Sequence, residues 1–314
     1  MNLQMSVVKN SKRWITLSLI LIIISLASMI AKGFNYGIDF SGGSLLQLKY
    51  ERPVTLKELN PVLDEISKKI PQFNSNSRKV QVSEDNSVII RTQEITNEQK
   101  EIVLTELKKS GEFTLTREDK VGASVGAELK RSALLALGIG TVLIILYITM
   151  RFEFRFAMAS IIAILHDIII AMGGISLLSY EVDTPFIAAI LTILGYSINN
   201  TIVVFDRIRE TLKRKTDLTF SELLDKSINQ VIIRSVNTSV TTLLAIIAIL
   251  VFGGDSLKTF ITTLLIGIVV GTYSSIFIAP SLIYLFEKDR DGKINNSKYL
   301  KTEDDDEHHE KIVV

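Results

Sequence analysis

The chain has 314 residues, of which 47% are hydrophobic, and its formal net charge at neutral pH is +1. A nearly neutral charge gives no support to nucleic-acid binding. The sequence contains no cysteine, which excludes disulfides, thiolate chemistry and cysteine-based metal sites. The hydrophobic residues are bunched in long runs, a pattern typical of a membrane-embedded protein.

Six of these runs approach the length of about 20 apolar residues that a helix needs to cross a bilayer. The six runs are residues 14–31, 132–150, 156–178, 185–205, 236–252 and 260–286. Within them only His166 and Asp167 have side chains that can be charged, and Pro280 is tolerable as a kink in the last run. The sequence therefore predicts an α-helical membrane protein with six transmembrane helices.

The distribution of positive charge predicts how the chain is oriented. The first apolar run is too long for a signal-peptide core and lacks an A-x-A cleavage site, so we expect an uncleaved anchor. Lysine and arginine in short loops mark the cytoplasmic side of a membrane, and they gather at residues 9–13, 151–155 and 207–234. We therefore expect an inner (cytoplasmic) membrane protein whose two termini, residues 1–13 and 287–314, are cytoplasmic, as is the loop 206–235.

Residues 32–131, between the first two runs, are charged and long enough to form a domain of their own. Four segments have strand-like composition: Leu45–Tyr50, Lys79–Val82, Val88–Arg91 and Glu112–Thr116. Two helical segments follow the capping signatures Thr55-x-x-Glu58 and Thr96-x-x-Gln99. The β-α-β-β-α-β order predicts an α+β ferredoxin-like domain, and the positive-charge pattern predicts that this domain is external.

Five sequence motifs follow one another along the chain. They are YGIDFSGGSLLQLKY at 36–50, VGASVGAEL at 121–129, HDIIIAMGG at 166–174, GYSINNTIVVFDRIRE at 195–210 and RSVNTSVTTLL at 234–244. Together they resemble the signatures of the SecF members of the RND-type SecD/SecF family. The residues that match the family signatures include Gly37, Asp39, Phe40, Gly42, Gly43, Gly122, Gly126, Glu128, Gly195, Asp206 and Arg207.

The resemblance implies a six-span half of a protein-export assembly. Such a half pairs with a SecD-like partner half, associates with the SecYEG channel, acts on exported polypeptides within the membrane lipid and uses the proton-motive force. The sequence has no Walker loop, so ATP chemistry would belong to a partner. We expect no enzymatic activity and no cofactor, metal or nucleic acid as a ligand.

Two other functions remain open. One is an RND-type exporter half for small molecules or lipids, although such exporters usually carry twice as many spans in one chain. The other is a passive scaffold of the translocation channel with no ion pathway of its own.

Five polar residues in or beside the spans are candidates for an ion pathway: His166, Asp167, Asn199, Asn200 and Arg234. On a helix, Asn199 shares a face with Gly195 and Asp206, so we expect the two asparagines to face the bundle. Their amides would either bond between helices or line a hydrated path. The resemblance implies a proton-carrying aspartate where this chain has Asn200, so the acid would be Asp167 or a carboxylate of the partner.

Asp167 lies near the middle of its span, where an ionised aspartate costs roughly 2.5–3.5 kcal/mol. A proton relay with His166 and a hydrogen-bonded pair that holds helices together both remain open. Neighbouring residues on a helix point about 100° apart, so we expect that the two side chains do not face one site.

Arg234 opens the fifth run, followed by many hydroxyl groups that would line water or bond to their own helix. The resemblance pairs Arg234 with the aspartate that Asn200 replaces. For Asp206 and Arg207 we expect a role in topology and docking. Gly267 and Gly271 form a small-residue face for packing inside the chain or against a partner.

Overall fold

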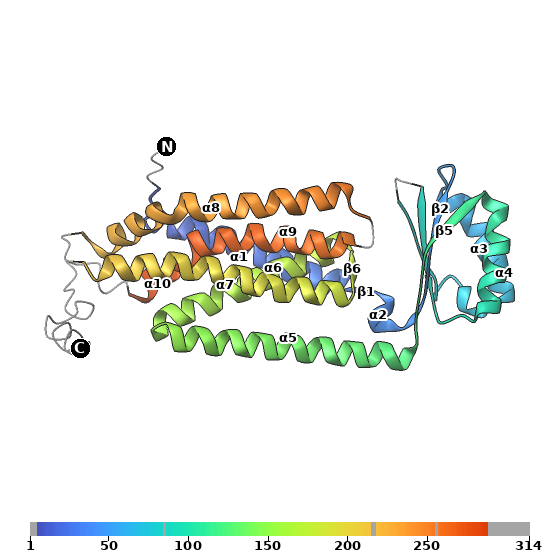
Figure 1. Cartoon of the computed structure of the whole chain (residues 1–314), viewed down its shortest axis with the longest axis horizontal. Coiled ribbons are helices and arrows are strands. Elements are labelled where there is room, and N and C mark those ends of the chain that lie inside the picture. The colour runs from blue at the N-terminus through green and yellow to red at the C-terminus, as the bar shows by residue number, and fades with distance from the viewer. Residues whose placement is uncertain (1–4, 84–85, 215–217, 255–256, 288–314) are drawn as a thin grey trace, which may run out of the picture. The chain divides into compact units, whose positions relative to one another are not determined.

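The computed structural model describes residues 5–83, 86–214, 218–254 and 257–287. The chain divides into two compact units. The first comprises residues 1–35, 137–180 and 185–314, and the second comprises residues 36–136 and 181–184. Figure 1 shows the first unit as a bundle of helices and the second as a sheet with helices on one face. Of the terminus 287–314, which we expect to be cytoplasmic, residues 288–314 lie outside the described residues.

Six helical segments of the described chain are long and apolar enough to cross a membrane. They are α1 (Ser11–Lys32), α5 (Ala123–Arg151), α6 (Phe154–Leu178), α7 (Thr184–Leu212), α8 (Phe220–Phe252) and the continuous segment Lys258–Phe286. That last segment consists of α9 (Lys258–Tyr273), a π-helical turn η4 (Ser274–Ile278) and α10 (Ala279–Phe286). The protein is therefore a multi-pass membrane protein.

Each of the six helical segments is longer than its apolar run, and α5, α7 and α8 exceed theirs by the most. Helix α5 begins at Ala123, directly after Gly122, although the apolar run begins only at residue 132. Helices α7 and α8 extend the fourth and fifth runs, so most of residues 206–235 is helical instead of a loop. Apolar composition therefore locates the part of a helix that is suited to lipid. The helix itself continues beyond that part, for as long as its backbone hydrogen bonds are made.

Small residues allow the helices of the bundle to approach closely. The serines of α1 at positions 11, 18, 25 and 28 are buried, and a side chain at Gly173 of α6 would overlap Ser25. A side chain at Gly267 would overlap Ile193, and one at Gly271 would meet Ser197. The small-residue face of α9 is thus used for packing within the chain, as expected for helices in a membrane.

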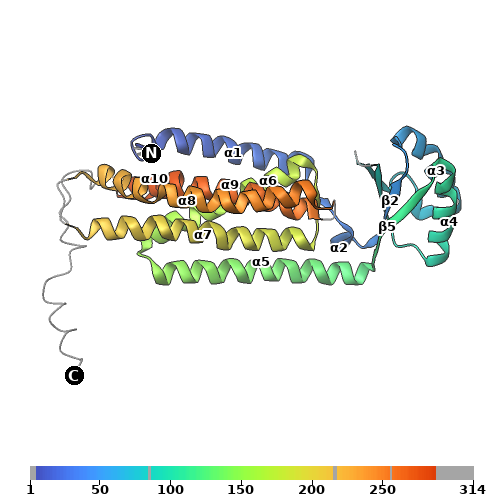
Figure 2. The same cartoon turned by 45° about the horizontal axis from the view of Figure 1, so that its top comes forward.

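Helix α5 lies at the margin of the bundle beside α7 in both views (Figures 1 and 2). Leu191 of α7 lies against Gly140. On the outer surface of α5, Ile139, Val142 and Leu143 are more than half exposed. Such side chains are suited to contact with lipid or with another membrane protein.

The second unit has the chain order β2 (Gly43–Tyr50), α3 (Leu56–Lys69), β3 (Lys79–Val82), β4 (Ser87–Thr92), α4 (Asn97–Leu107) and β5 (Phe113–Val121). The strands lie in the order β3-β4-β2-β5, and all neighbours are antiparallel. This is the β-α-β-β-α-β order that the sequence predicts. Short 3₁₀ turns at Pro71–Phe73 and Lys108–Ser110 follow the two helices, and β1 (Asn35–Tyr36) pairs with β6 (Glu181–Val182).

Alternating residues of the central strand β2 serve the two faces of the sheet. Leu46, Leu48 and Tyr50 belong to the main core of the unit, together with Leu59 and Leu63 of α3. The intervening Leu45 instead packs in a small cluster with Ile38 and Ile89. The register that pairs Leu46 with Ile90 keeps both core residues on the helical face.

The two predicted capping signatures behave differently. Thr96 forms a complete capping box with Gln99 at the start of α4, as predicted. Thr55 precedes α3 but makes no side-chain bond to the backbone. Its hydroxyl donates instead to the Glu58 carboxylate, at 3.0 Å, so the predicted cap at Thr55 is wrong although the helix begins where expected.

Candidate functional site

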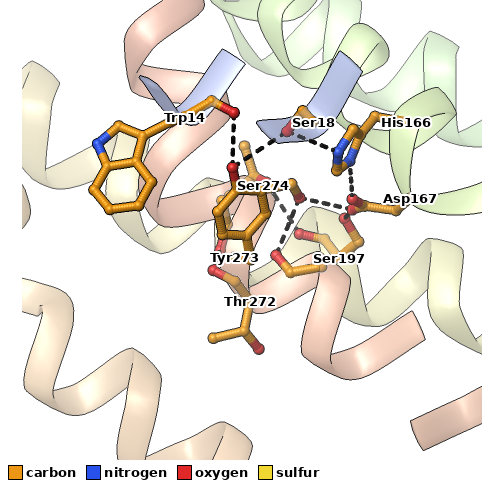
Figure 3. Close-up of polar contacts among 11 residues, drawn as sticks. Trp14, Ser18, His166, Asp167, Ser197, Thr272, Tyr273 and Ser274 are labelled. Carbon is orange, nitrogen blue, oxygen red and sulfur yellow. Dashed lines mark hydrogen bonds and ion pairs between the residues drawn. The ribbon is translucent and has the colours of Figure 1, made fainter. Parts of the chain in front are cut away.

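A buried carboxylate in the helix bundle binds polar groups from three segments, α6, α7 and η4 (Figure 3). Asp167 of α6 is 0% exposed. One of its oxygens, Oδ2, accepts hydrogen bonds from Ser197 of α7 at 2.5 Å and from Ser274 of η4 at 2.8 Å. The other oxygen, Oδ1, lies 2.8 Å from Nδ1 of His166. Every close partner of this carboxylate is thus neutral or, in the case of His166, able to titrate.

The network continues from His166 to the first helix. Nε2 of His166 lies 3.1 Å from the hydroxyl of Ser18, and this hydroxyl lies 3.3 Å from that of Tyr273. Tyr273 in turn donates to the backbone carbonyl of Trp14 at 2.8 Å. An unbroken chain of polar contacts therefore joins Asp167 to the beginning of α1.

The expectation that His166 and Asp167 do not face one site is wrong. Their backbone positions do point in different directions, but both side chains are nearly fully buried and bend toward each other within hydrogen-bond distance. The imidazole then lies between Asp167 and Ser18, because α1 packs directly against this part of α6. The expectation considered only the directions of the Cα–Cβ bonds. The side chains of His166 and Asp167 are long enough to bend toward each other beyond Cβ.

Local backbone geometry positions Ser274. The residues Ser274–Ile278 form a π-helical turn, which begins immediately after Tyr273 and ends just before Pro280. Proline cannot donate a backbone hydrogen bond, and insertions of this kind in helices are frequent at functional sites. Gly271 adds space, because a side chain there would come within 3.5 Å of the Asp167 carboxylate.

The two asparagines of α7 point in different directions. Asn200 is 4% exposed, and its amide nitrogen has no hydrogen-bond partner in the described structure. Asn199 is exposed, as is Gly195 on the same face. The expectation that both asparagines face the bundle is therefore correct for Asn200 and wrong for Asn199, since adjacent residues on a helix differ by about 100°.

Arg234 is exposed near the middle of α8, next to the buried Ser235, whose hydroxyl has no partner in the described structure. Thr238 donates to the carbonyl of Arg234 at 2.9 Å, and Thr242 donates to that of Thr238 at 3.0 Å. These hydroxyls therefore bond to their own helix, which is one of the two roles expected for the hydroxyl-rich stretch. None of these residues has a described contact with Asp167.

A second, smaller polar contact joins three helices. The hydroxyl of Ser239 on α8 lies 2.6 Å from that of Thr272 on α9, and it accepts a bond from Tyr196 of α7 at 3.2 Å. All three groups are neutral hydroxyls, so this cluster has no group that titrates near neutral pH. It therefore stabilises packing and does not resemble the site at Asp167.

The charged end of the fourth motif forms ion pairs at the surface. Asp206 lies 3.2 Å from Arg151 and 3.9 Å from Arg209. Arg207 pairs with Glu210 and donates to Gln230 of α8 at 2.6 Å. These contacts link the ends of α5, α7 and α8.

The two glycine motifs meet in the second unit. Gly43 has a φ of +129°, and a side chain there would collide with the carbonyl of Thr92 on the neighbouring strand. A side chain at Gly126 would come within 3.0 Å of the backbone nitrogen of Gly42. Gly122 has nothing closer than Glu94, at 3.9 Å. The glycines of both motifs therefore permit the start of β2 to lie against the start of α5.

Three of the remaining signature residues lie in or beside the short helix α2 (Ile38–Ser41): Gly37, Asp39 and Phe40. The backbone nitrogen of Gly37 donates to the carbonyl of Val182 at 3.0 Å, and Asp39 accepts from the backbone of Thr184 at 3.0 Å. Phe40 is half-buried and Glu128 is exposed. Gly37 and Asp39 therefore hold the backbone around α2 against residues 182–184.

An ion pair in the same unit was not predicted. Arg91 of β4 contacts Glu181 of β6, and both side chains are largely buried. Burial lowers the pKa of Arg91 and raises the pKa of Glu181, while the attraction between the two opposes both shifts. The pair holds β6 against the sheet.

Sequence reasoning also missed four residues of the site: Ser18, Ser197, Tyr273 and Ser274. A signal was present for Ser18, because serines recur every seven residues at position 11, just before the first run, and at positions 18 and 25 within it. The others could not be assigned from spacing, since their contacts to the pair join residues far apart in the chain.

The six spans, the single α+β unit and a buried titratable pair define a class: helical membrane proteins with a polar site inside the bundle. Comparison with known proteins identifies the family. The model described as protein export membrane protein SecD/SecF, C-terminal, matches residues 100–289, and the SecD/SecF GG motif matches residues 27–54. The chain belongs to the SecD/SecF family of protein-export membrane proteins.

Several relatives cover nearly the whole chain. Protein translocase subunit SecF of Sebaldella termitidis is 49% identical over 91% of this chain and 93% of its own length. The Helicobacter pylori subunit of the same name is 36% identical over 93% of this chain and 90% of its own. These relatives confirm the resemblance inferred from the five motifs.

A solved structure shares the fold. The crystal structure of SecDF from Thermus thermophilus, described as a translocon-associated membrane protein, has a TM-score of 0.81 and 38% identity. The match covers 90% of this chain and 38% of the SecDF chain. A SecDF structure in a super-membrane-facing form matches with a TM-score of 0.66. The present chain thus spans about two fifths of the SecDF protein.

Proposed function

We propose that this chain is an accessory subunit of the Sec translocase that promotes protein export together with a SecD-like half, coupled to the proton-motive force through Asp167 and His166. The observation that carries the proposal is the fully buried carboxylate, which binds neutral hydroxyls and one histidine and has no lysine or arginine in its described contacts. A buried ionisable pair inside a membrane protein indicates an ion or proton site.

A partner half is supported by the polar residues that the spans expose. Asn199 on α7 and Arg234, Asn237 and Thr238 on α8 are exposed within helices that cross the membrane. Such groups are costly in lipid unless another protein or water receives them. We place a SecD-like half against this surface of α7 and α8, and the SecYEG channel and exported polypeptides among the further partners.

The positive-charge pattern supports cytoplasmic termini and an external sheet unit in the inner membrane. Two cysteine variants test this orientation, because the chain has no cysteine of its own. An impermeant thiol reagent added outside intact cells should modify Ser75→Cys in the sheet unit and leave Lys213→Cys unmodified. The opposite labelling pattern would overturn the orientation.

The function is tested by translocation into proteoliposomes that contain this chain, its SecD-like partner and the channel. An imposed proton gradient should stimulate translocation with the wild-type chain, and Asp167→Asn should lose that stimulation while it keeps the uncoupled rate. Thr192→Val serves as a control that removes an exposed hydroxyl of the next helix, which bonds only to the carbonyl of Ala188 in the same helix. Full stimulation with Asp167→Asn would contradict the proposed coupling.

A passive scaffold is the second candidate. It is favoured by Asn200, because an amide cannot load or release a proton at the position where the family pattern has an aspartate. In that case the variant Asp167→Asn would translocate like the wild type under a gradient.

A further inference from the structure

We infer that the His166–Asp167 pair holds one exchangeable proton in the conformation of this structure, and that the hydroxyl of Ser18 changes its hydrogen-bond partner when that proton leaves. The inference deepens the proposed function and rests on it only in taking this pair as the titrating site. It follows from counting the hydrogens that the contacts of Figure 3 require.

The count begins at the far end of the network. The backbone carbonyl of Trp14 has no hydrogen to give, so the hydroxyl of Tyr273 must donate in their 2.8 Å contact. A tyrosine hydroxyl has one hydrogen. The oxygen of Tyr273 can therefore only accept from Ser18, whose hydroxyl hydrogen is used in the 3.3 Å contact between them.

The next contact fixes one nitrogen of the imidazole. With its own hydrogen directed at Tyr273, the oxygen of Ser18 can only accept from His166 in their 3.1 Å contact. Nε2 of His166 therefore carries a hydrogen. This assigns the state of the ring from its surroundings, without reference to its proton affinity.

The last contact requires a further hydrogen. Nδ1 of His166 and Oδ1 of Asp167 lie 2.8 Å apart, and a bond between them needs one hydrogen on either atom. The pair is then an imidazolium with a carboxylate, or a neutral imidazole with a carboxylic acid. Both forms contain one proton more than a neutral histidine beside a carboxylate. Both also have zero net charge, which suits a site without other charges.

The surroundings are consistent with this count. Oδ2 of Asp167 accepts from Ser197 and Ser274, so neither hydroxyl needs a hydrogen from the acid. In the described structure, His166 is the one residue that forms an ion pair with Asp167. The other titratable group of the network is Tyr273, whose ring centre lies 6.3 Å from that of His166.

Loss of the proton forces a rearrangement. The neutral histidine must keep its hydrogen on Nδ1 to bind the carboxylate, so Nε2 becomes an acceptor. Ser18 then turns its hydrogen toward Nε2, and the contact with Tyr273 no longer has a hydrogen. At 3.3 Å this contact is the longest of the network and the easiest to lose. The proton on α6 is thereby coupled to the bond between α1 and α9.

Nitrogen NMR of the full chain in lipid bilayers measures this state directly. The sequence has three histidines, and replacing His308 and His309 with asparagine leaves His166 as the single labelled ring when a histidine-free affinity tag is used. Near neutral pH we expect a hydrogen on Nε2, and at high pH a transition to bare Nε2 with a hydrogen on Nδ1. A bare Nε2 near neutral pH would overturn the inference.

Variants separate the proton from simple packing. The amide of Asp167→Asn can donate to Nδ1 and accept from the serines, so it should keep a hydrogen on Nε2 and abolish the transition. Tyr273→Phe removes the acceptor for Ser18 and should lower the fraction of protonated Nε2 at a fixed pH. Thr16→Val removes an exposed hydroxyl of α1, the helix that carries Ser18, and should change neither result. A transition that persists unchanged in Asp167→Asn would contradict the inference.

The outcomes distinguish this inference from the proposed function. A normal NMR transition combined with full gradient-driven translocation by Asp167→Asn would retain the proton and reject its use in export. A wild-type Nε2 without hydrogen, combined with lost coupling in that variant, would retain the function and reject the proton count.

Discussion

The two units of the molecule each contain a carboxylate with little exposure, held in opposite ways. In the sheet unit, Glu106 contacts Lys109 at 2.5 Å and Lys69 at 2.7 Å. Hydrogen bonds from Lys109 and then from Lys69 lower the pKa of Glu106 to about 2. In the helix bundle, Asp167 contacts two serines and a histidine. The first carboxylate stays charged at physiological pH, whereas the charge of the second site depends on one proton.

The comparison is tested most severely by removing the buried carboxylate of the helix bundle. Asp167→Ala leaves His166, Ser197 and Ser274 without their acceptor. Two of these bonds join different helical segments and the third lies within α6; at about 0.6–1.7 kcal/mol each, they predict a loss of roughly 2–5 kcal/mol in the free energy of unfolding.

Asp206→Ala is the matched control for this loss, because it removes a carboxylate from surface pairs with Arg151 and Arg209. Exposed pairs of this kind contribute about 0–1 kcal/mol. Unfolding of the full chain in mixed detergent micelles measures both variants, and equal losses would show that the site at Asp167 is not a tightly bonded network.

Gly43→Ala tests the sheet unit by a backbone effect. A residue with a side chain at a φ of +129° is strained, and its Cβ would collide with the carbonyl of Thr92. We expect a loss of roughly 1–3 kcal/mol, from strain alone, in the stability of the sheet unit. Gly122→Ala is the control, since the nearest atom is 3.9 Å away. Hydrogen exchange of the β2 and β4 amides should rise only in the first variant, and unchanged exchange there would contradict this geometry.

The pH dependence of the sheet unit follows from Glu106. Its pKa is lowered from 4.5 to about 2 on folding, so its charged form stabilises the fold above pH 4.5, and that contribution is lost as the pH falls toward 2. Hydrogen exchange in α4 should therefore accelerate between these two pH values. Glu106→Gln should weaken this acceleration, whereas Glu51→Gln should preserve it. A wild-type profile in Glu106→Gln would rule out this ion cluster as the cause.

The smallest expected effect compares the two helix starts of the sheet unit. Thr96→Ala removes a complete capping box and should destabilise α4 by about 1 kcal/mol. Thr55→Ala removes no bond to the backbone and should cost less. Exchange rates of the first-turn amides in the two variants measure the difference, and equal effects would mean that Thr55 caps α3 in solution.

Local patterns were sufficient to predict much of the fold. Apolar runs located the six spans because each helix must satisfy its own backbone in lipid. Strand-like composition, at Leu45–Tyr50 and three further segments, predicted the strands of the sheet. Thr55 and Thr96 share one signature, yet only Thr96 caps its helix, because the hydroxyl of Thr55 donates to Glu58 instead of accepting from the backbone.

The candidate site was predictable only in part. A charged residue in an apolar run singled out Asp167, since such residues are rare in lipid. Its partners depend on how α1, α7 and η4 meet α6, and the π-helical turn that directs Ser274 has no sequence signal comparable to an apolar run. The contrast between Asn199 and Asn200 likewise depends on the rotation of α7 within the bundle.

The central claim, that His166 and Asp167 form a titrating site, is tested most directly by counting protons. The full chain, purified with its SecD-like partner in lipid nanodiscs, is shifted from neutral to alkaline pH in weakly buffered solution with an indicator dye. We predict that the wild-type complex releases one more proton per chain than the Asp167→Asn complex. Identical release by the two complexes would contradict the claim.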